Sequence, residues 1–143
     1  MILLRKLLFY GYTFMLLGVG ASGIFVAAWE LTRVFGIPLA GLDPRVRATM
    51  LNQYRFLKSA ELSFGLFSLF FRERIFDEAA VRTLFVTMVF LGVGARVFSV
   101  VVDGAPHWAF LAFAALEFVT GIAMLTGWPA PKSPASPTAG QSL

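Results

Sequence analysis

Cysteine is absent from this 143-residue chain, and histidine occurs once, as His107. The lack of cysteine excludes structural disulfides, thiol catalysis and iron–sulfur clusters. A single histidine cannot supply the His and Cys ligands of a transition-metal site. We therefore expect neither a metal nor a cofactor.

Charge is also scarce, because only 14% of the residues are charged and 58% are hydrophobic. A soluble domain carries about 25% charged residues, so the composition indicates one membrane domain. The net charge of +4 could suit nucleic acid. However, half of the basic residues flank apolar runs, where they act as topology signals. We expect no nucleic-acid partner.

Four segments are long enough to cross a bilayer, which takes roughly 20 residues. They predict an all-α, integral membrane four-helix bundle within residues 1–128. The second segment differs from the others because charged residues occupy its first half. A cleaved signal peptide is the alternative for the first, although its apolar run exceeds the usual ~7 to 15 residues. The predicted spans are Leu7–Trp29, Met50–Phe71, Ala80–Val102 and Trp108–Trp128.

The loops predict the orientation of the chain. Six basic residues fall on the side of the N-terminus and three on the opposite side, so both termini should be cytoplasmic, in a bacterial inner membrane. The Pro-rich residues 129–143 should form a disordered cytoplasmic tail. The first group is Arg5, Lys6, Arg72, Arg74, Arg82 and Lys132, and the second is Arg33, Arg45 and Arg47.

Aromatic residues and one turn mark the expected ends of the spans. Amphipathic rings settle at membrane interfaces, which places Trp29 and Trp108 at the outer interface. Residues Asp103–Pro106 should form the outer turn between spans three and four, with Pro106 opening the last helix. The inner interface should hold Tyr10, Tyr12 and Trp128.

Ionisable residues inside the predicted spans are the main clue to function, because a charge in hydrocarbon is costly unless it is paired or hydrated. The third span carries a stripe at helical spacing through Arg96, Ser99 and Asp103. The second carries a similar stripe through Lys58 and Glu61, which can also pair along their own helix. The candidate ligand-binding cluster is Arg55, Lys58, Glu61, Arg96, Ser99, Asp103 and Glu117.

The depths of two residues along their predicted helices indicate one ion pair. At 1.5 Å per residue, Arg96 lies roughly 10 Å below the outer turn and Glu117 roughly 15 Å below it, and an arginine side chain spans that difference. We therefore predict contact between Arg96 and Glu117.

Two interpretations of the cluster stay open. The charges can simply brace the helices and set their register. Alternatively, they can line a pocket in the outer half of the bundle, bordered by Arg55, Glu61 and Arg96, that binds a small molecule or a lipid head group. Proton relay and catalysis are further alternatives. Catalysis has little support because no nucleophile accompanies a histidine base.

Two glycine-containing patterns need separate interpretation. Residues 18–23 match the dinucleotide fingerprint G-x-G-x-x-G, but they lie mid-helix without a preceding strand, so close helix packing is the better explanation. Residues 17–21 recur as residues 91–95, and the surroundings of Glu61 are echoed around Glu117. Two copies of one hairpin or coincidence among apolar residues would both explain this likeness.

The run from Gly94 to Pro106, with Arg96, Ser99 and Asp103-Gly104, resembles the signature of the bacterial membrane proteins called domain of unknown function 4345. Glu117 in the next span and the segment from Asn52 to Gly65 extend the resemblance. It implies a four-span membrane protein and supplies no activity. The likeness to the DoxX family is weaker.

These observations favour a non-enzymatic accessory protein, or one that binds a lipid or small apolar molecule. A protein partner or a homo-oligomer stays open. The alternatives are a proton- or substrate-coupled carrier and a membrane enzyme acting on an apolar substrate such as a sterol-like or quinone molecule. Four helices leave little room for alternating access, which disfavours the carrier.

Overall fold

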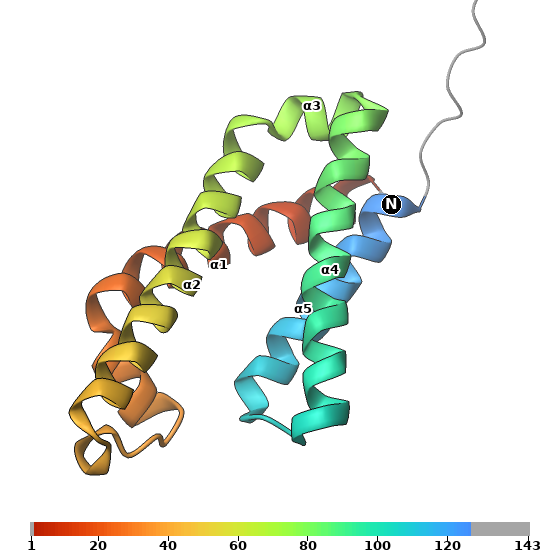
Figure 1. Ribbon diagram of the computed structural model, residues 1–143. Coiled ribbons are helices and arrows are strands. Elements are labelled where there is room, and N and C mark those ends of the chain that lie inside the picture. Colours follow the sequence, from red (N-terminus) through yellow and green to blue (C-terminus); the bar gives the residue numbers. More distant parts are fainter. Residues whose placement is uncertain (1, 127–143) are drawn as a thin grey trace, which may run out of the picture.

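The computed structural model describes residues 2–126, in which all regular structure is helical (Figure 1). Each of the four predicted spans corresponds to a long helix. Trp128 and the tail expected at residues 129–143 lie outside the described residues. The long helices are α1 (Ile2–Trp29), α2 (Pro44–Phe70), α4 (Ala79–Asp103) and α5 (Trp108–Leu125). The connections contain η1 (Glu30–Val34), η2 (Leu39–Gly41) and the short helix α3 (Arg72–Asp77).

Among residues 2–126, three segments are long and apolar enough to cross a membrane: α1 with η1, α4, and α5. Helix α2 does not meet this criterion, because half of its first ten residues are polar or charged and three more charges follow at Arg55, Lys58 and Glu61. Its 27 residues span about 40 Å, which exceeds the ~30 Å hydrocarbon core. Helix α2 is therefore long enough for its polar first turns to extend beyond the hydrocarbon.

Helices α1 and α2 form a closely packed hairpin. The buried stripe of α1 runs through Leu16, Gly20, Gly23 and Ala27, with the alternating spacing of four and three that keeps one face on a neighbouring helix. A Cβ atom at Gly20 would lie 2.5 Å from the backbone nitrogen of Leu62. This confirms that small residues here permit close approach of a helix, as expected for the mid-helix G-x-G-x-x-G match.

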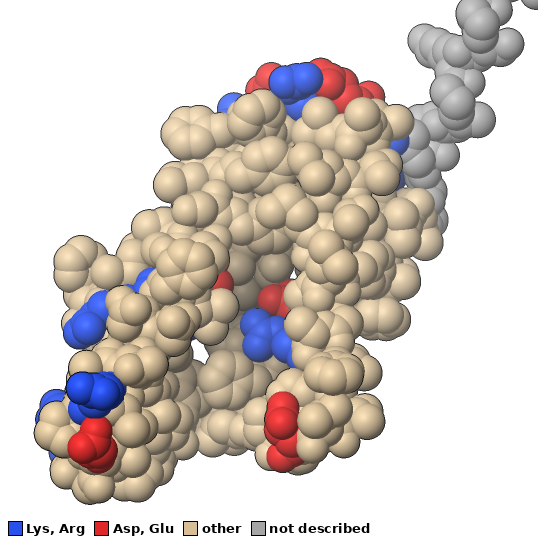
Figure 2. All heavy atoms as spheres, viewed as in Figure 1, with Lys and Arg blue, Asp and Glu red and all other residues tan. Residues whose placement is uncertain are grey.

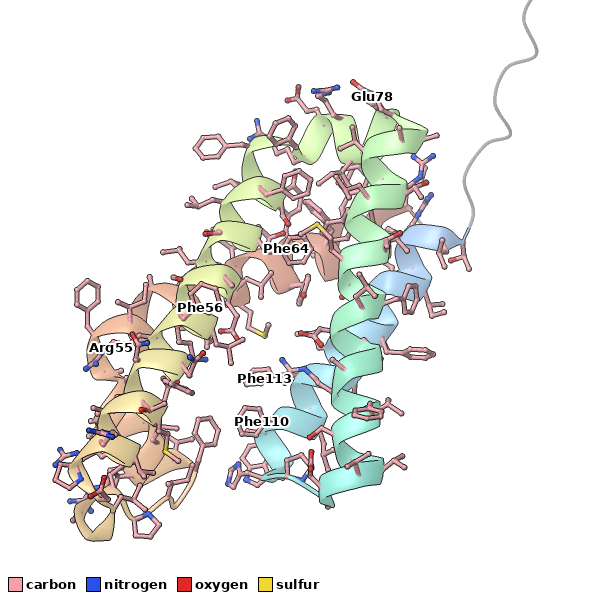
Figure 3. The ribbon with its side chains drawn as sticks, viewed as in Figure 1. Arg55, Phe56, Phe64, Glu78, Phe110 and Phe113 are labelled. Carbon is pink, nitrogen blue, oxygen red and sulfur yellow. The ribbon has the colours of Figure 1, made fainter. Side chains whose placement is uncertain are left out.

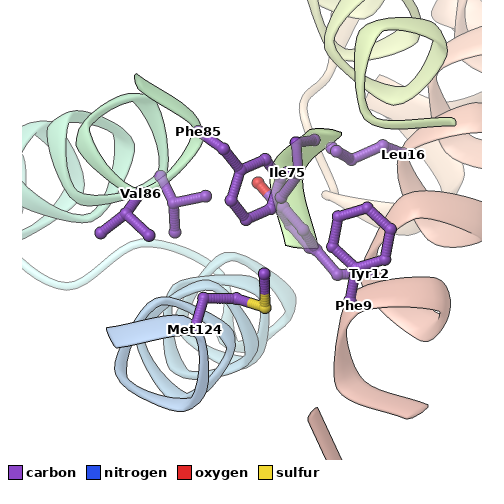
Figure 4. Packing of buried hydrophobic residues seen from close by; sticks show 8 residues of the cluster. Phe9, Tyr12, Leu16, Ile75, Phe85, Val86 and Met124 are labelled. Carbon is purple, nitrogen blue, oxygen red and sulfur yellow. The ribbon is translucent and has the colours of Figure 1, made fainter. Parts of the chain in front are cut away.

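A hydrophobic core joins this hairpin to the second one, formed by α4 and α5 (Figure 4). Ile75 of α3 is fully buried in this core and packs the short connecting helix against it. Tyr12, expected at the inner interface, is only 2% exposed, and its ring packs in this core. It lies three residues after Phe9 and four before Leu16, on the same buried face. The core residues are Phe9, Tyr12, Leu16, Ile75, Phe85, Val86, Val89 and Met124.

Away from this core the two hairpins diverge (Figure 1). At the opposite end they meet again, where the Phe35 and Phe110 rings stack with centroids 4.5 Å apart. Figure 2 shows a hollow between the two arms, with acidic and basic side chains inside it. The predicted single four-helix bundle is therefore not confirmed; the structure is better described as two joined hairpins. The two ends of the described chain lie near each other (Figure 1).

The turn between α4 and α5 differs in one detail from expectation. Gly104 adopts φ +92° and ends α4, a conformation that favours glycine. Helix α5 begins at Trp108, and the Nδ1 atom of its N-cap residue His107 accepts a hydrogen bond from the Ala109 nitrogen at 3.3 Å. Pro106 precedes the helix and does not open it, because His107 already supplies the cap.

Candidate functional site

The predicted ion pair between Arg96 and Glu117 is confirmed and ties α4 to α5. Arg96 Nε donates to Glu117 Oε2 at 3.0 Å, and Nη2 donates to Oε1 at 3.3 Å. The Glu117 side chain is 8% exposed and that of Arg96 is 28% exposed. Gly92, one turn before Arg96, faces the carboxylate, and a Cβ there would lie in ordinary van der Waals contact, 3.8 Å from Oε2. A two-bond arrangement of this kind fixes the orientation of both groups.

Lys58 and Glu61 form a second ion pair within α2, with 3.0 Å between Lys58 Nζ and Glu61 Oε2. The stem of Lys58 packs on α1, where a Cβ at Gly23 would lie 2.5 Å from Lys58 Cδ. Its Nζ lies 5.1 Å from the centroid of the Tyr54 ring, within the range of a cation–π contact. Lys58 is thus buried against α1 and has both an acidic and an aromatic partner.

A small cavity lies between the two ion pairs. Its volume is about 10 Å³, close to the ~10 to 15 Å³ that one water molecule needs. Glu61 and Arg96 both border it, as predicted, but it is far too small for an organic ligand. Its lining residues are Met15, Leu16, Val19, Glu61, Arg96, Phe113 and Glu117.

Arg55 does not belong to this site, contrary to expectation. Its Nε donates to the Ile24 carbonyl oxygen at 3.1 Å, and the residue is exposed. Figure 3 shows its side chain on the outer side of the first hairpin. Arg55 directly follows the buried Tyr54, which turns it by about 100° around α2 from that residue. Its side chain therefore reaches α1 at the exposed edge of the hairpin and does not line the small cavity.

Ser99 and Asp103 lie further toward the outer turn. Ser99 Oγ donates to Asp103 Oδ2 at 2.9 Å, and both residues are exposed. They share the helical face of Arg96, as their spacing predicted, but Asp103 makes no ion pair among the contacts of residues 2–126.

A much larger groove begins at Arg96 and runs along α4 and α5 toward the outer turn. Its volume is about 450 Å³, within the ~300 to 1,000 Å³ of small-molecule sites. Most of its lining is aliphatic or aromatic, and Arg96 and Ser99 supply the polar side chains. The sequence did not predict this groove, because its aliphatic residues are indistinguishable from lipid-facing ones. It is lined by Arg96, Val97, Ser99, Val100, Val101, Pro106, Phe110, Leu111 and Ala114.

Neither of these two ion pairs joins one hairpin to the other. Arg96 and Glu117 link α4 to α5, whereas Lys58 and Glu61 lie on one helix. The bracing interpretation therefore applies within the second hairpin and not between the two. Arg96 borders both the small cavity and the large groove. It therefore lies between the polar centre, formed by the two ion pairs, and the mainly apolar groove.

Within residues 2–126 no group of three or more His, Cys, Asp or Glu side chains could hold a metal ion. The polar centre instead offers hydrogen-bond donors and acceptors in an apolar setting. Such groups can orient the polar part of a ligand.

A family model described as Domain of unknown function (DUF4345) matches residues 6–128. The chain belongs to this family. The match spans the four long helices except residues 2–5 of α1, and it includes Arg96, Glu117 and the other residues of the candidate site. The comparisons find no match to the chain among curated proteins or among solved structures. Because the family has no assigned activity, function must be argued from the site.

Proposed function

We propose that this member of the DUF4345 family is a non-enzymatic membrane protein that binds a small amphipathic molecule in the groove between α4 and α5. Arg96 would bind a carbonyl, hydroxyl or anionic head of this ligand. The aliphatic walls would hold an apolar body. The ligand would enter from the lipid phase, since a single charged end and an apolar groove suit a molecule that partitions into membranes.

The observation that carries this proposal is that Arg96 both pairs with Glu117 and borders the large groove. Its pairing with Glu117 occupies two guanidinium N–H donors out of the five that arginine has. The side chain remains 28% exposed at the end of a groove of about 450 Å³. Glu117 holds the guanidinium in place, so that its remaining donors are preorganised for an acceptor on a ligand.

The proposed setting is a bacterial inner membrane with both termini in the cytoplasm. The excess of basic residues at that end of the chain supports this orientation, and so does the proximity of the two described chain ends (Figure 1). The groove would then open in the outer half of the membrane, near the turn at Gly104.

The test is purification in mild detergent followed by mass spectrometry of the extracted small molecules and lipids. The wild-type chain should retain one compound in a near-stoichiometric amount. Ala114→Phe adds a ring inside the groove without removing a charge, and it should abolish retention. Arg96→Lys keeps the charge but loses the two parallel hydrogen bonds of the guanidinium to Glu117. It should weaken retention.

Arg74→Gln is the matched control, because Arg74 lies on α3, outside the groove, and pairs with Glu78. It should retain the compound as the wild type does. The proposal fails if the wild type retains nothing specific, or if Ala114→Phe retains the same compound in the same amount.

A further inference from the structure

A second groove lies at the opposite end of the molecule, where α3 approaches the start of α1. Its volume is about 390 Å³. Figure 2 shows basic and acidic side chains gathered at the α3 end of the molecule. The lining combines three basic residues, two acidic residues and an apolar wall. These residues are Arg5, Lys6, Arg72, Glu73 and Asp77, with the wall formed by Ile2, Tyr10 and Phe76.

The basic and acidic residues of this groove come mainly from different helices. Two basic residues, Arg5 and Lys6, come from α1, whereas both acidic residues come from α3. Glu73 and Asp77 are four residues apart on α3, so their carboxylates share one side of that helix. Arg72 is already bridged to Glu73, but only at 3.4 Å and with both side chains largely exposed. An exposed pair of this kind is weak and can exchange partners.

The position of the groove matches that of a lipid headgroup. Helix α1 begins with exposed apolar residues, including Ile2 at 66% and Leu3 at 71% exposure, which need an apolar environment. In α3, Ile75 is buried in the core while Arg72 and Glu73 are exposed. The charged lining therefore lies at the boundary between an apolar helix surface and the polar end of the molecule. Tyr10, an amphipathic ring, lines the groove at the same level, as interface residues do.

We propose that this groove binds the headgroup of an aminophospholipid, a lipid that carries both a phosphodiester and a primary ammonium group. The phosphodiester contacts Lys6, Arg5 and Arg72, since basic pockets at the cytoplasmic end of membrane helices suit phosphate. The ammonium group contacts Glu73 and Asp77. A purely anionic headgroup would leave those two carboxylates facing negative charge, which disfavours it. This inference does not depend on the groove at Arg96.

The experiment uses the full chain in nanodiscs of phosphatidylcholine to which phosphatidylethanolamine or phosphatidylglycerol is added in equal amounts. Native mass spectrometry after transfer to detergent counts the lipids that stay bound. The two added lipids separate an ammonium requirement from a preference for negative charge. Phosphatidylcholine has the same phosphodiester, but its trimethylated nitrogen donates no hydrogen bond. The wild type should retain one phosphatidylethanolamine in preference to the other two lipids.

Paired variants separate the two halves of the headgroup. Lys6→Gln with Arg72→Gln should lower retention of every phospholipid, by about fivefold for each basic residue removed. Glu73→Gln with Asp77→Asn should keep retention but remove the preference for phosphatidylethanolamine over phosphatidylcholine. Arg74→Gln removes a basic residue of the same helix that lies outside the groove and should behave as wild type.

Three results would overturn the inference. The wild type could retain no phospholipid specifically, or it could prefer phosphatidylglycerol. The preference for phosphatidylethanolamine could also survive both pairs of substitutions, which would place the lipid elsewhere. All changes are at the exposed end of the molecule, and an unchanged thermal transition in detergent verifies that each variant is folded.

Discussion

Arg96 and Glu117 are joined by two hydrogen bonds, and only the arginine also borders the large groove. The acid is buried and the base is partly exposed. Glu117 therefore acts mainly as the structural anchor of the pair, and Arg96 as its accessible group.

This relationship predicts that neither residue can be neutralised alone without a loss of stability. Glu117→Gln or Arg96→Gln alone should lower the free energy of unfolding by about 3 to 5 kcal/mol, since each leaves a charge without its partner. The double variant Arg96→Glu with Glu117→Arg should recover part of that loss. Equilibrium unfolding in mixed detergent micelles measures all three. Strictly additive losses would mean that the pair does not interact.

The contact between α1 and α2 should tolerate no side chain at Gly20. A Cβ there would lie 2.5 Å from the Leu62 backbone nitrogen, so Gly20→Ala must push the helices apart and should destabilise by about 1 to 3 kcal/mol. Gly18→Ala is the control, because nothing lies within 4 Å of its Cβ position. Thermal unfolding in detergent should show a lower midpoint for Gly20→Ala only. Equal midpoints would contradict the close helix packing.

Lys58 and Glu61 should behave as a unit. Lys58→Met leaves the Glu61 carboxylate unpaired and should cost about 3 kcal/mol, whereas Lys58→Met with Glu61→Met should cost much less, because a buried ion pair can be replaced by apolar groups of similar volume. Arg72→Gln breaks an exposed pair and should stay within about 0.5 kcal/mol of wild type. The free energy of unfolding in detergent is measured for the wild type and for each variant. A double variant no better than Lys58→Met would show that Glu61 has another essential partner.

The absence of cysteine makes topology directly measurable by single-cysteine labelling. Ala40→Cys and Ala105→Cys lie in the loops at one end of the hairpins, and Ala80→Cys lies at the start of α4. If α2 crosses the membrane despite its charges, an impermeant maleimide should label positions 40 and 105 in cells with a permeable outer envelope. Position 80 should react only after the inner membrane is opened. Labelling of 40 and 80 from the same side would show that α2 does not cross.

Much of this arrangement could be predicted from the sequence because it is local. The lengths of α1, α4 and α5 follow from their apolar runs, and the contact between Arg96 and Glu117 follows from depth along two helices joined by a short turn. The stripe through Lys58, Glu61 and Gly65 was also visible, although the sequence could not show that α1 covers it.

The remaining features depend on packing between distant segments. The divergence of the hairpins is set by the core around Phe85 and Ile75 and by the contact of Phe35 with Phe110, which both join segments far apart in the sequence. The burial of Tyr12 could not be predicted because a tyrosine near a span end also suits an interface. Arg55 was included in the site because it lies one position round the helix from the stripe through Lys58 and Glu61, and the sequence could not show that its side chain turns away from the second hairpin.

Photo-crosslinking from within the groove tests the binding proposal most directly. The photoreactive amino acid p-benzoylphenylalanine is placed at Leu111, which lines the groove, or at Val119, an exposed residue of the same helix outside it. After irradiation in native membranes, the mass of the intact protein is measured by mass spectrometry. Position 111 should yield one adduct of a single defined mass, and position 119 only a mixture of bulk phospholipids. The same phospholipid mixture at both positions would contradict a specific ligand beside Arg96.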